Sequence, residues 1–495
     1  MKRPIHVALM SGKVLRRIIA VILLVLAGRT FKASGQTVTN LYSFIGTSSD
    51  GGNPQAPLIQ GSDSNFYGTA PAGFVQFKTN NYGTVFRIGP DGSFTNLHSF
   101  NGIDGAYPIA GLVQGSDGSF YGTTVNAGIT NFGTVFRIST SGSYTNLHSL
   151  VGSPGDGRQP DARLVQGIDG SFYGTTIYGG ASTNCNFGCG TVFRFSVSGG
   201  YTNLYSFVGS PIDGANPTAG LVRGSDGNFY GTTRNGGANA AGTVFRISPN
   251  GSCTNLHSFG NSPGDAALPA AGLVQGSDGN FYGTTLFGGV TSPQNTSGYG
   301  VIFRINTSGV YTNLYSFVSP PGDGNFPTGG LVQGSDGRFY GTTQQGGANG
   351  NGIIYRITPN GSYTNLYPFA GYPNDGSQPN AGLVQGGDGN FYGTTTFGGI
   401  NNSGTVYRLS VPINPPPYPI NQITNAQVAT SDIVLSVVSI AGETYQLQFS
   451  SSMNPTNWVN VPGVSVTNSI GALLTLTNFG GAVGPQGFYR FDITP

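Results

Sequence analysis

Short runs of β-branched and aromatic residues alternate with turn residues along most of the chain. In one stretch, four such runs follow one another, at Leu112–Gln114, Phe120–Thr124, Thr134–Ile138 and Tyr144–Leu150. Runs bounded by Gly, Asp, Asn and Ser predict β-strands, and the Ser-Asp-Gly-Ser link between the first two runs predicts a tight hairpin. No apolar pattern at helical spacing lasts for ten residues, so the chain is predicted to be all-β.

The same set of four runs recurs seven times. The phenylalanine that opens the Phe-Tyr-Gly-Thr segment marks each copy, and successive copies are 54, 52, 57, 52, 58 and 52 residues apart, at Phe66, Phe120, Phe172, Phe229, Phe281, Phe339 and Phe391. A period of this size indicates a repeat architecture. Four short antiparallel strands per copy, repeated around an axis, predict a seven-bladed β-propeller.

The two ends of the repeat region predict how the ring closes. If the strands of each copy are named A to D, a D-type run at Asn40–Phe44 precedes the first A run, and the seventh copy stops after its C run at Thr405–Leu409. The N-terminal strand is therefore expected to complete the last blade and to leave no unpaired sheet edge.

The repeat gives four expected regions: a signal peptide at 1–35, the propeller at 36–410, a Pro-rich linker at 411–422 and a small β-sandwich module at 423–495. The linker contains Pro415-Pro-Pro417, which is typical of a semi-rigid spacer. Alternating runs after it predict a small sandwich.

The N-terminus changes the interpretation of the charge. Basic residues followed by a short apolar run at 18–27 and by Ala33-Ser-Gly35 predict a secretory signal peptide, with no span of a bilayer in the mature chain. Cleavage of this peptide would remove seven of the 21 basic residues. The mature chain would then carry 14 basic and 19 acidic residues, a formal net charge of −5. Nucleic-acid binding is therefore not expected.

The repeat resembles a known family. Gly272–Thr285 reads Gly-Leu-Val-Gln-Gly-Ser-Asp-Gly-Asn-Phe-Tyr-Gly-Thr-Thr, and Gly-Thr-Val-Phe-Arg-Ile and Thr-Asn-Leu-Tyr-Ser-Phe follow in several copies. This pattern is similar to the GloVer tandem repeat of secreted bacterial "choice-of-anchor" proteins, over about three quarters of the chain. Thr444–Ser451, Trp458 and Phe488–Arg490 resemble small C-terminal β modules of such proteins. The resemblance implies a secreted or cell-surface location and no particular activity.

Most acidic residues belong to two repeated series. The Asp of the A–B turn is expected to form a structural ion pair with the arginine of the C strand. Removal of one member of such a pair would leave the other charge without a partner. The aspartates are Asp63, Asp117, Asp169, Asp226, Asp278, Asp336 and Asp388, and the arginines are Arg87, Arg137, Arg194, Arg246, Arg304, Arg356 and Arg408. The second series follows the pattern Asp-x-x-x-Pro between strands D and A and is expected to cap its own turns.

Neither series predicts a metal or cofactor site. A calcium ion needs six to eight oxygen ligands, and one aspartate per blade does not supply them. His98, His148 and His257 replace tyrosine in D strands of separate blades, so they cannot converge on a metal. Cys185 and Cys189 lie in one loop, where a local disulfide and an unpaired pair are both compatible with the sequence. Cys253 is expected to act as a small buried residue.

The candidate ligand site comes from departures from the repeat. Arg158, Asp161 and Arg163 replace small or polar residues in blade three, and Arg234 lies in the B–C loop of blade four. The B–C and D–A connections are long and variable and share one face of the disc, where binding residues usually lie. The alternative is a solvated charge cluster without a ligand.

These observations predict a secreted, non-catalytic, monomeric propeller that binds a carbohydrate or protein at the cell exterior. One alternative is an extracellular lyase or glycosidase, which would need acid and base groups that converge on one point. Another is a structural matrix protein.

Overall fold

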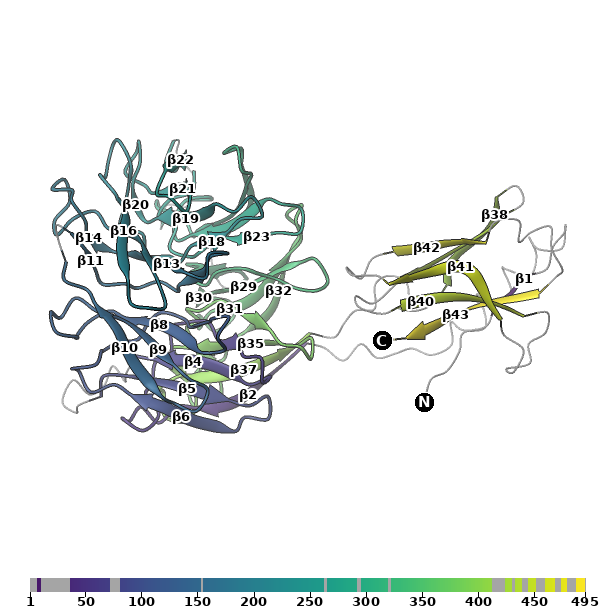
Figure 1. The fold of residues 1–495 in the computed structure, drawn as a ribbon, viewed down its shortest axis with the longest axis horizontal. Coiled ribbons are helices and arrows are strands. Elements are labelled where there is room, and N and C mark those ends of the chain that lie inside the picture. Colours follow the sequence, from purple (N-terminus) through teal and green to yellow (C-terminus); the bar gives the residue numbers. More distant parts are fainter. Residues whose placement is uncertain are drawn as a thin grey trace. The chain divides into compact units, whose positions relative to one another are not determined.

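The computed structural model describes residues 36–71, 81–152, 155–261, 265–291, 295–318 and 322–411, together with the backbone of seven further strands. The chain divides into two compact units, Gln36–Ser410 and a second unit formed by Met1–Gly35 with Val411–Pro495. The described residues contain β-strands and no helix (Figure 1). The all-β prediction is confirmed.

The first unit is a seven-bladed β-propeller, and each blade is a four-stranded antiparallel sheet. The first three blades consist of β3 (Ile59–Gln60), β4 (Phe66–Ala70), β5 (Thr84–Ile88) and β6 (Phe94–Ser99); β7 (Val113–Gln114), β8 (Phe120–Thr124), β9 (Thr134–Ile138) and β10 (Tyr144–Ser149); and β12 (Val165–Gln166), β13 (Phe172–Thr176), β15 (Thr191–Phe195) and β16 (Tyr201–Ser206). The next three consist of β18 (Val222–Arg223), β19 (Phe229–Thr233), β21 (Thr243–Ile247) and β22 (Cys253–Ser258); β23 (Val274–Gln275), β24 (Phe281–Thr285), β25 (Val301–Ile305) and β26 (Tyr311–Ser316); and β28 (Val332–Gln333), β29 (Phe339–Thr343), β31 (Ile353–Ile357) and β32 (Tyr363–Pro368).

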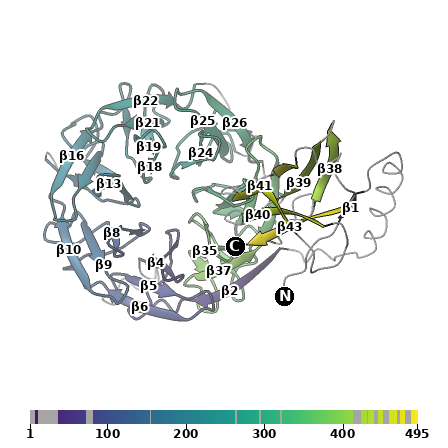
Figure 2. The ribbon, with the colours of Figure 1, turned by 45° about the vertical axis from the view of Figure 1, so that its right-hand side comes forward.

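The seventh blade takes its strands from both ends of the unit. It consists of β34 (Val384–Gln385), β35 (Phe391–Thr395), β37 (Thr405–Ser410) and β2 (Thr37–Ser43). Strand β2 pairs with β37 in antiparallel register, with Thr37 opposite Ser410 and Ser43 opposite Thr405. In every blade the A strand is nearest the axis and the D strand is outermost, as β18 and β22 show for blade four (Figure 2).

The B strand explains why glycine is part of the repeat. All five residues of each B strand are buried. A methyl group at Gly122 would lie 2.6 Å from Cζ of Phe136 on the neighbouring C strand, and one at Gly231 would lie 2.6 Å from Cζ of Phe245. The glycine therefore makes room for the aromatic ring of the C strand, which is phenylalanine in five blades and tyrosine, Tyr355 or Tyr407, in the other two.

An aromatic pair between B strands recurs at the junctions of neighbouring blades. The tyrosine of one B strand packs against the phenylalanine of the next, with ring centroids 4.0 Å apart between Tyr67 and Phe120 and 4.2 Å apart between Tyr173 and Phe229. The junction of blade seven with blade one has the same pair, Tyr392 and Phe66, at 4.0 Å. The contact therefore continues around the whole ring.

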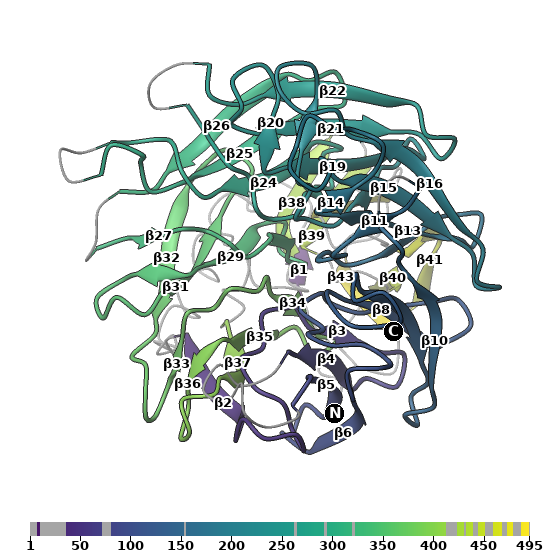
Figure 3. The same cartoon turned by 90° about the vertical axis from the view of Figure 1, so that its left-hand side faces the viewer.

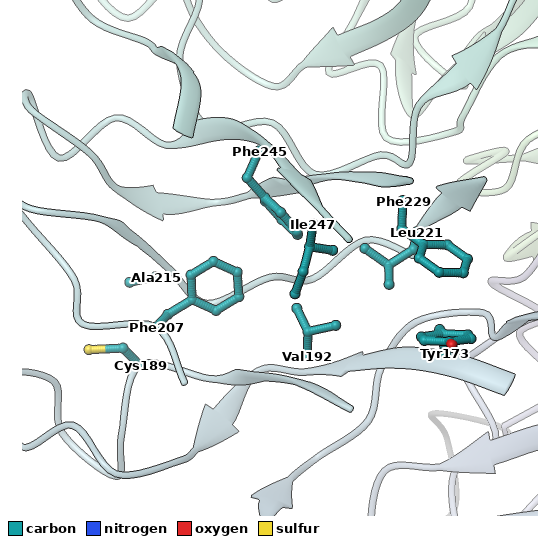
Figure 4. Close-up of a cluster of buried hydrophobic side chains, with 9 residues drawn as sticks. All are labelled: Tyr173, Cys189, Val192, Phe207, Ala215, Leu221, Phe229, Phe245 and Ile247. Carbon is teal, nitrogen blue, oxygen red and sulfur yellow. The ribbon is translucent and has the colours of Figure 1, made fainter. Parts of the chain in front are cut away.

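Hydrophobic side chains fill the space between blades. The cluster between blades three and four includes Tyr173 and Val192 from one blade and Leu221, Phe229 and Phe245 from the other (Figure 4). Seven threonines, one per B strand, also donate a hydrogen bond to a backbone carbonyl of the next blade, as Thr232 Oγ1 does to the Ala271 oxygen at 3.3 Å. Blade packing thus combines apolar burial with satisfied polar groups.

The sequence did not predict four two-stranded ribbons that join the D–A and B–C connections of one blade. These ribbons are β11 (Gly157–Arg158) with β14 (Tyr178–Gly179), β17 (Gly214–Ala215) with β20 (Asn235–Gly236), β27 (Gly324–Asn325) with β30 (Gln345–Gly346), and β33 (Gly376–Ser377) with β36 (Phe397–Gly398) (Figure 3). They make the long connections part of an ordered surface.

The second unit contains two sheets. One has the order β1-β43-β40-β41, formed by Val7–Leu9, Gly487–Thr494, Thr444–Ser450 and Val459–Thr467, and the other has the order β38-β39-β42, formed by Ile423–Ala429, Asp432–Val438 and Leu473–Asn478. The predicted signal peptide lies outside the described residues apart from β1, and the predicted linker lies outside them apart from Val411. No helix within the described residues is long and apolar enough to cross a bilayer.

Candidate functional site

A cavity of about 550 Å³ opens on the face of the propeller that carries the B–C and D–A connections, which we call the loop face. All seven blades contribute the residue that directly follows the proline of the D–A connection, and several also contribute residues that follow the B strand. The lining residues are Gln55, Ile109, Asp161, Thr218, Arg234, Ala270, Leu286, Phe287, Phe326, Thr328, Gln344, Gln345 and Asn380.

The backbone before each of these prolines is held in an unusual conformation. The preceding residue has a positive φ in all seven blades, 57° at Tyr107, 54° at Asn216 and 55° at Phe326. This region is unfavourable for residues other than glycine, so the surrounding structure must enforce it. Its backbone is bonded on both sides: Asn216 N donates to the Cys189 oxygen, and Arg234 N donates to the Asn216 oxygen. These bonds fix the residue that follows the proline at the cavity wall.

Asp161 and Arg163 lie on one side of the chain as it enters blade three. Ala162 and Leu164 are buried, whereas Asp161 is partly accessible and Arg163 is exposed. This alternation places the two charged side chains on the accessible side. Other blades have glycine or proline at the position of Arg163, and a methyl group at Gly220 would lie 2.7 Å from the Arg163 oxygen. The backbone of Arg163 therefore lies in close contact with the backbone of the next blade.

The charged side chains of this region lack protein partners. Within the described residues, neither a side-chain hydrogen bond nor an ion pair joins Asp161, Arg163 or Arg234 to another residue. Burial raises the pKa of Asp161 to about 7, and the charge of Arg234 opposes this increase. Burial also lowers the pKa of Arg163, although its side chain is exposed.

The remaining cavity wall combines amides, hydroxyls and aromatic rings. Phe287 and Phe326 pack edge to face with ring centroids 5.5 Å apart. Thr218 Oγ1 is buried without a hydrogen-bond partner. Asn380 Nδ2 donates to Thr396 Oγ1 at 2.8 Å. An unsatisfied hydroxyl beside apolar rings is a feature that a polar ligand with an apolar face would complement.

Arg158, the fourth sequence-predicted residue, does not line this cavity. Its guanidinium carbon lies 4.9 Å from the ring centroid of Phe132, 5.6 Å from that of Tyr178 and 4.8 Å from that of Phe187. Phe187 lies in the loop closed by the Cys185–Cys189 disulfide, so these cysteines are bridged. Asp161 and Arg234 thus line one cavity, whereas Arg163 is not among its lining residues and Arg158 is held among aromatic rings through cation–π contacts.

The aspartates of the A–B turns have a partner that the sequence reasoning missed. In each blade the tyrosine of the B strand donates a hydrogen bond to this carboxylate, as Tyr230 Oη does to Asp226 at 2.7 Å. Burial and this bond raise the pKa of Tyr230 to about 12. The predicted Asp–Arg ion pair forms in blades two and three, between Arg137 and Asp117 at 3.0 Å and between Arg194 and Asp169 at 2.8 Å.

The difference between blades depends on the residue two positions after the aspartate. In blades two and three this residue is serine, and Ser119 accepts a second bond from Arg137 Nε at 3.0 Å. In four other blades it is asparagine, and Asn228 Nδ2 instead donates to the Asp226 carboxylate at 2.8 Å. In blade four, Arg246 lies near the Tyr230 hydroxyl, where its charge opposes the increase in the Tyr230 pKa. For the other blades a direct Asp–Arg pair stays a prediction.

The D–A aspartates organise their own loops. Asp323 is buried and accepts hydrogen bonds from the hydroxyls of Tyr315 and Tyr363, each at 2.8 Å, and from two backbone N–H groups. His98 and His148 take the place of Tyr315 in their blades and contact Asp104 and Asp156. Within the described part of the chain, no group of three His, Cys, Asp or Glu residues is arranged to hold a metal ion.

Comparison with known proteins identifies the family of the repeat. The model of the Gloeobacter/Verrucomicrobia repeat matches residues 27–187, 74–290 and 274–414. The chain belongs to this family. The family resemblance noted from the repeat sequence is thereby confirmed. No curated protein matches the chain.

Solved structures resemble the chain at low sequence identity. The extracellular domain of a protein assigned as a hybrid two component system of B. thetaiotaomicron has 10% identity and a TM-score of 0.49, over 90% of this chain and 55% of that one. A protein assigned as a 6-phosphogluconolactonase of Bacteroides uniformis has 14% identity and a TM-score of 0.45, over 83% of this chain and 99% of that one. The chain thus spans about half the length of the first of these proteins.

Proposed function

We propose that this member of the Gloeobacter/Verrucomicrobia repeat family is a secreted, non-catalytic propeller that binds a carbohydrate in the cavity of the loop face. The observation that carries the proposal is the composition of the wall. The amides of Gln55 and Gln344 provide donors and acceptors for sugar hydroxyls. The ring pair Phe287 and Phe326 provides an apolar surface for the face of a sugar ring.

A binding role agrees with the carboxylates present. Hydrolysis of a glycosidic bond requires two carboxyl groups on either side of the bond. Among the described residues that line the cavity, Asp161 is the one carboxylate. The aspartates of the A–B and D–A series are bonded within their own turns and do not line this wall. The wall therefore supports recognition better than bond cleavage.

Ring closure, the arrangement of the second unit and secretion are also part of the proposal. We propose that the pairing of β2 with β37 holds the ring shut, that the two sheets of the second unit form a sandwich, and that residues 1–35 direct secretion. The first of these is supported by the register of Thr37 with Ser410, and the second by the two separate sheets.

Thermal unfolding in the presence of oligosaccharides tests the binding function. A ligand that binds only the folded state at 100 times its Kd stabilises that state by about 2.7 kcal/mol. We expect such a rise in Tm for the native chain and a loss of it in Gln344→Ala, which removes an amide from the wall. Asn360→Ala, an exposed amide in a C–D turn, is the matched control. The proposal fails if no oligosaccharide raises Tm, or if Gln344→Ala and Asn360→Ala respond alike.

A further inference from the structure

A cluster of aromatic rings around Arg158 lies on the loop face beside the cavity. Arg158 is three residues before Asp161, which lines the cavity, so their Cα atoms are at most about 11 Å apart. Arg158 pairs with Tyr178 across the ribbon of β11 and β14 (Figure 3). In blades five and six the residues at the position of Tyr178, Phe287 and Gln345, line the cavity. The cluster therefore adjoins the cavity wall.

The guanidinium of Arg158 lies over two phenylalanine rings. Its central carbon is 4.9 Å from the ring centroid of Phe132 and 4.8 Å from that of Phe187. These contacts hold the guanidinium in place, but they provide no acceptor for its five N–H donors. Nε is buried without a hydrogen-bond partner, and no side-chain hydrogen bond or ion pair joins Arg158 to another residue in the described part of the chain. The cluster therefore holds a positioned donor group without an acceptor.

Phe187 is exposed in a conformation that the surrounding loop must enforce. The residue is 67% exposed, and its φ of 69° lies in a region that is unfavourable for a bulky side chain. The Cys185–Cys189 disulfide closes the loop around it, and its carbonyl oxygen accepts a hydrogen bond from Gly179 N at 2.8 Å. Residues held in such conformations are concentrated at ligand sites. The loop thus presents a preorganised ring beside the Arg158 donors.

The packing of the blades does not require this cluster. Alanine takes the position of Arg158 in blade four, where Ala215 pairs with Asn235 in a ribbon of the same kind. The third cysteine of the chain, Cys253, lies in a D strand, so the disulfide loop is specific to blade three. The arginine, the exposed ring and the disulfide therefore serve a purpose other than blade packing.

We infer that the bound carbohydrate is an oligosaccharide longer than the cavity, and that its outer units lie over blade three, with a sugar ring against Phe187 and hydroxyls bonded to Arg158. This inference rests on the proposed function and specifies the length and path of its ligand. A sugar hydroxyl can accept a charge-assisted bond from a guanidinium, and the apolar face of the sugar ring packs on an aromatic ring. Because one molecule makes both contacts, contact in the cavity raises the effective concentration at the cluster.

Isothermal titration with oligomers of increasing length tests the inference. The probes are β-1,4-linked oligomers of glucose, of mannose and of xylose, each from the dimer to the octamer. In a series that binds, we expect the Kd of the native chain to fall at least about tenfold from the shortest binding oligomer to the octamer, because only the longer oligomers reach the cluster. Gln344→Ala, in the cavity wall, should weaken binding at every length.

Two variants remove the contacts of the cluster with little change to the backbone. Phe187→Asn introduces a residue that tolerates a positive φ, and Arg158→Ala introduces the residue of blade four. Each should raise the Kd of the octamer by roughly fivefold or more and leave the Kd of the shortest binding oligomer unchanged. Ile400→Asn is the matched control, since it replaces a similarly exposed apolar residue in the B–C connection of blade seven, and it should leave both values unchanged.

The outcomes separate the inference from the function. Equal affinity at every length, or a loss in Ile400→Asn without one in Phe187→Asn, overturns the inference and leaves the carbohydrate function intact. Binding that neither Phe187→Asn nor Arg158→Ala alters at any length also overturns it, and leaves the cluster to a protein partner. Absence of binding at every length overturns the function and the inference together. Circular dichroism and Tm of each variant distinguish loss of binding from loss of fold.

Discussion

Replacing Asp161 with asparagine should stabilise the propeller at pH 8 and leave its stability at pH 4 unchanged. Burial raises the pKa of Asp161 from its ordinary value of 3.8 to about 7, against the opposing charge of Arg234. The folded chain therefore binds this proton more tightly than the unfolded chain does. Its contribution to stability is fully present below about pH 4 and is lost as pH rises to about 7. Asparagine does not titrate, so it escapes this loss.

The displacement of the pKa sets the size of the effect. One pKa unit corresponds to about 1.4 kcal/mol, so a change from 3.8 to about 7 gives a ceiling of about 4 kcal/mol above pH 7. Asp161 is partly accessible to water, which reduces the penalty, and we expect about half of the ceiling. In a domain of this size about 1 kcal/mol moves Tm by about 2 °C, which gives a gain of about 4 °C at pH 8.

Calorimetry from pH 4 to pH 8 measures this gain, and Asp388→Asn provides a control of opposite sign. Burial alone would raise the pKa of Asp388, but hydrogen bonds from Asn390 and Tyr392 lower it below its ordinary value. Its contribution is therefore present above pH 3.8 and is lost as pH falls through its lowered pKa, so Asp388→Asn should destabilise the chain at neutral pH. A gain in Asp161→Asn that is the same at pH 4 and pH 8, or no gain at pH 8, would refute the reasoning.

Two further predictions follow from the fold. Gly231→Ala should cost about 1–3 kcal/mol in the free energy of unfolding, because a methyl group there meets the ring of Phe245; Gly322→Ala, with no atom within 4 Å of the added methyl, should be neutral in urea unfolding. Deletion of residues 36–44 should expose the edge of β37 and produce concentration-dependent association in analytical ultracentrifugation, and a monomer with unchanged Tm would contradict this.

The sequence predicted the repeated parts of the fold because their physical requirements are local. The Asp-Gly turn, the apolar strand runs and the glycine beside Phe136 recur in the same order in every blade. The predicted strand at Thr134–Ile138 agrees with β9 in both bounds. The two-stranded ribbons were missed because their strands are two residues long and contain glycine, as in β14 at Tyr178–Gly179.

Side-chain partners were harder to predict because they depend on distances between strands. The Asp226 carboxylate and the Tyr230 hydroxyl lie four positions apart across a hairpin, and the tyrosine was interpreted only as an apolar strand residue. The cavity wall was found in part, since Asp161 and Arg234 stood out as charged departures from the repeat. The uncharged part of the wall could also have been predicted from the sequence. The residue after the D–A proline, for example Thr218 or Asn380, varies between blades, whereas its neighbours stay nearly constant.

Departures from the repeat are concentrated between blades three and four on both faces. On the A–B face, a glutamine of the A strand normally accepts a hydrogen bond from the turn of the preceding blade, as Gln275 Oε1 does from Ser225 N at 2.9 Å. At this junction Arg223 takes the place of the glutamine and the exposed Ile168 takes the place of the serine. The aromatic pair of Tyr173 with Phe229 remains, so the junction keeps its packing without the glutamine link.

The retained packing explains how this junction can carry unpaired charges. Contacts that hold neighbouring blades together lie on the B strands and recur at each junction, as the Thr175 Oγ1 bond to the Ala219 oxygen at 3.1 Å shows for blades three and four. The residues that follow the proline and the B strand contribute little to those contacts, so their identity is free to vary. A ring of equivalent blades thereby provides a rigid frame on which residues that line the cavity, such as Asp161 and Arg234, can differ from blade to blade while the packing between blades is kept.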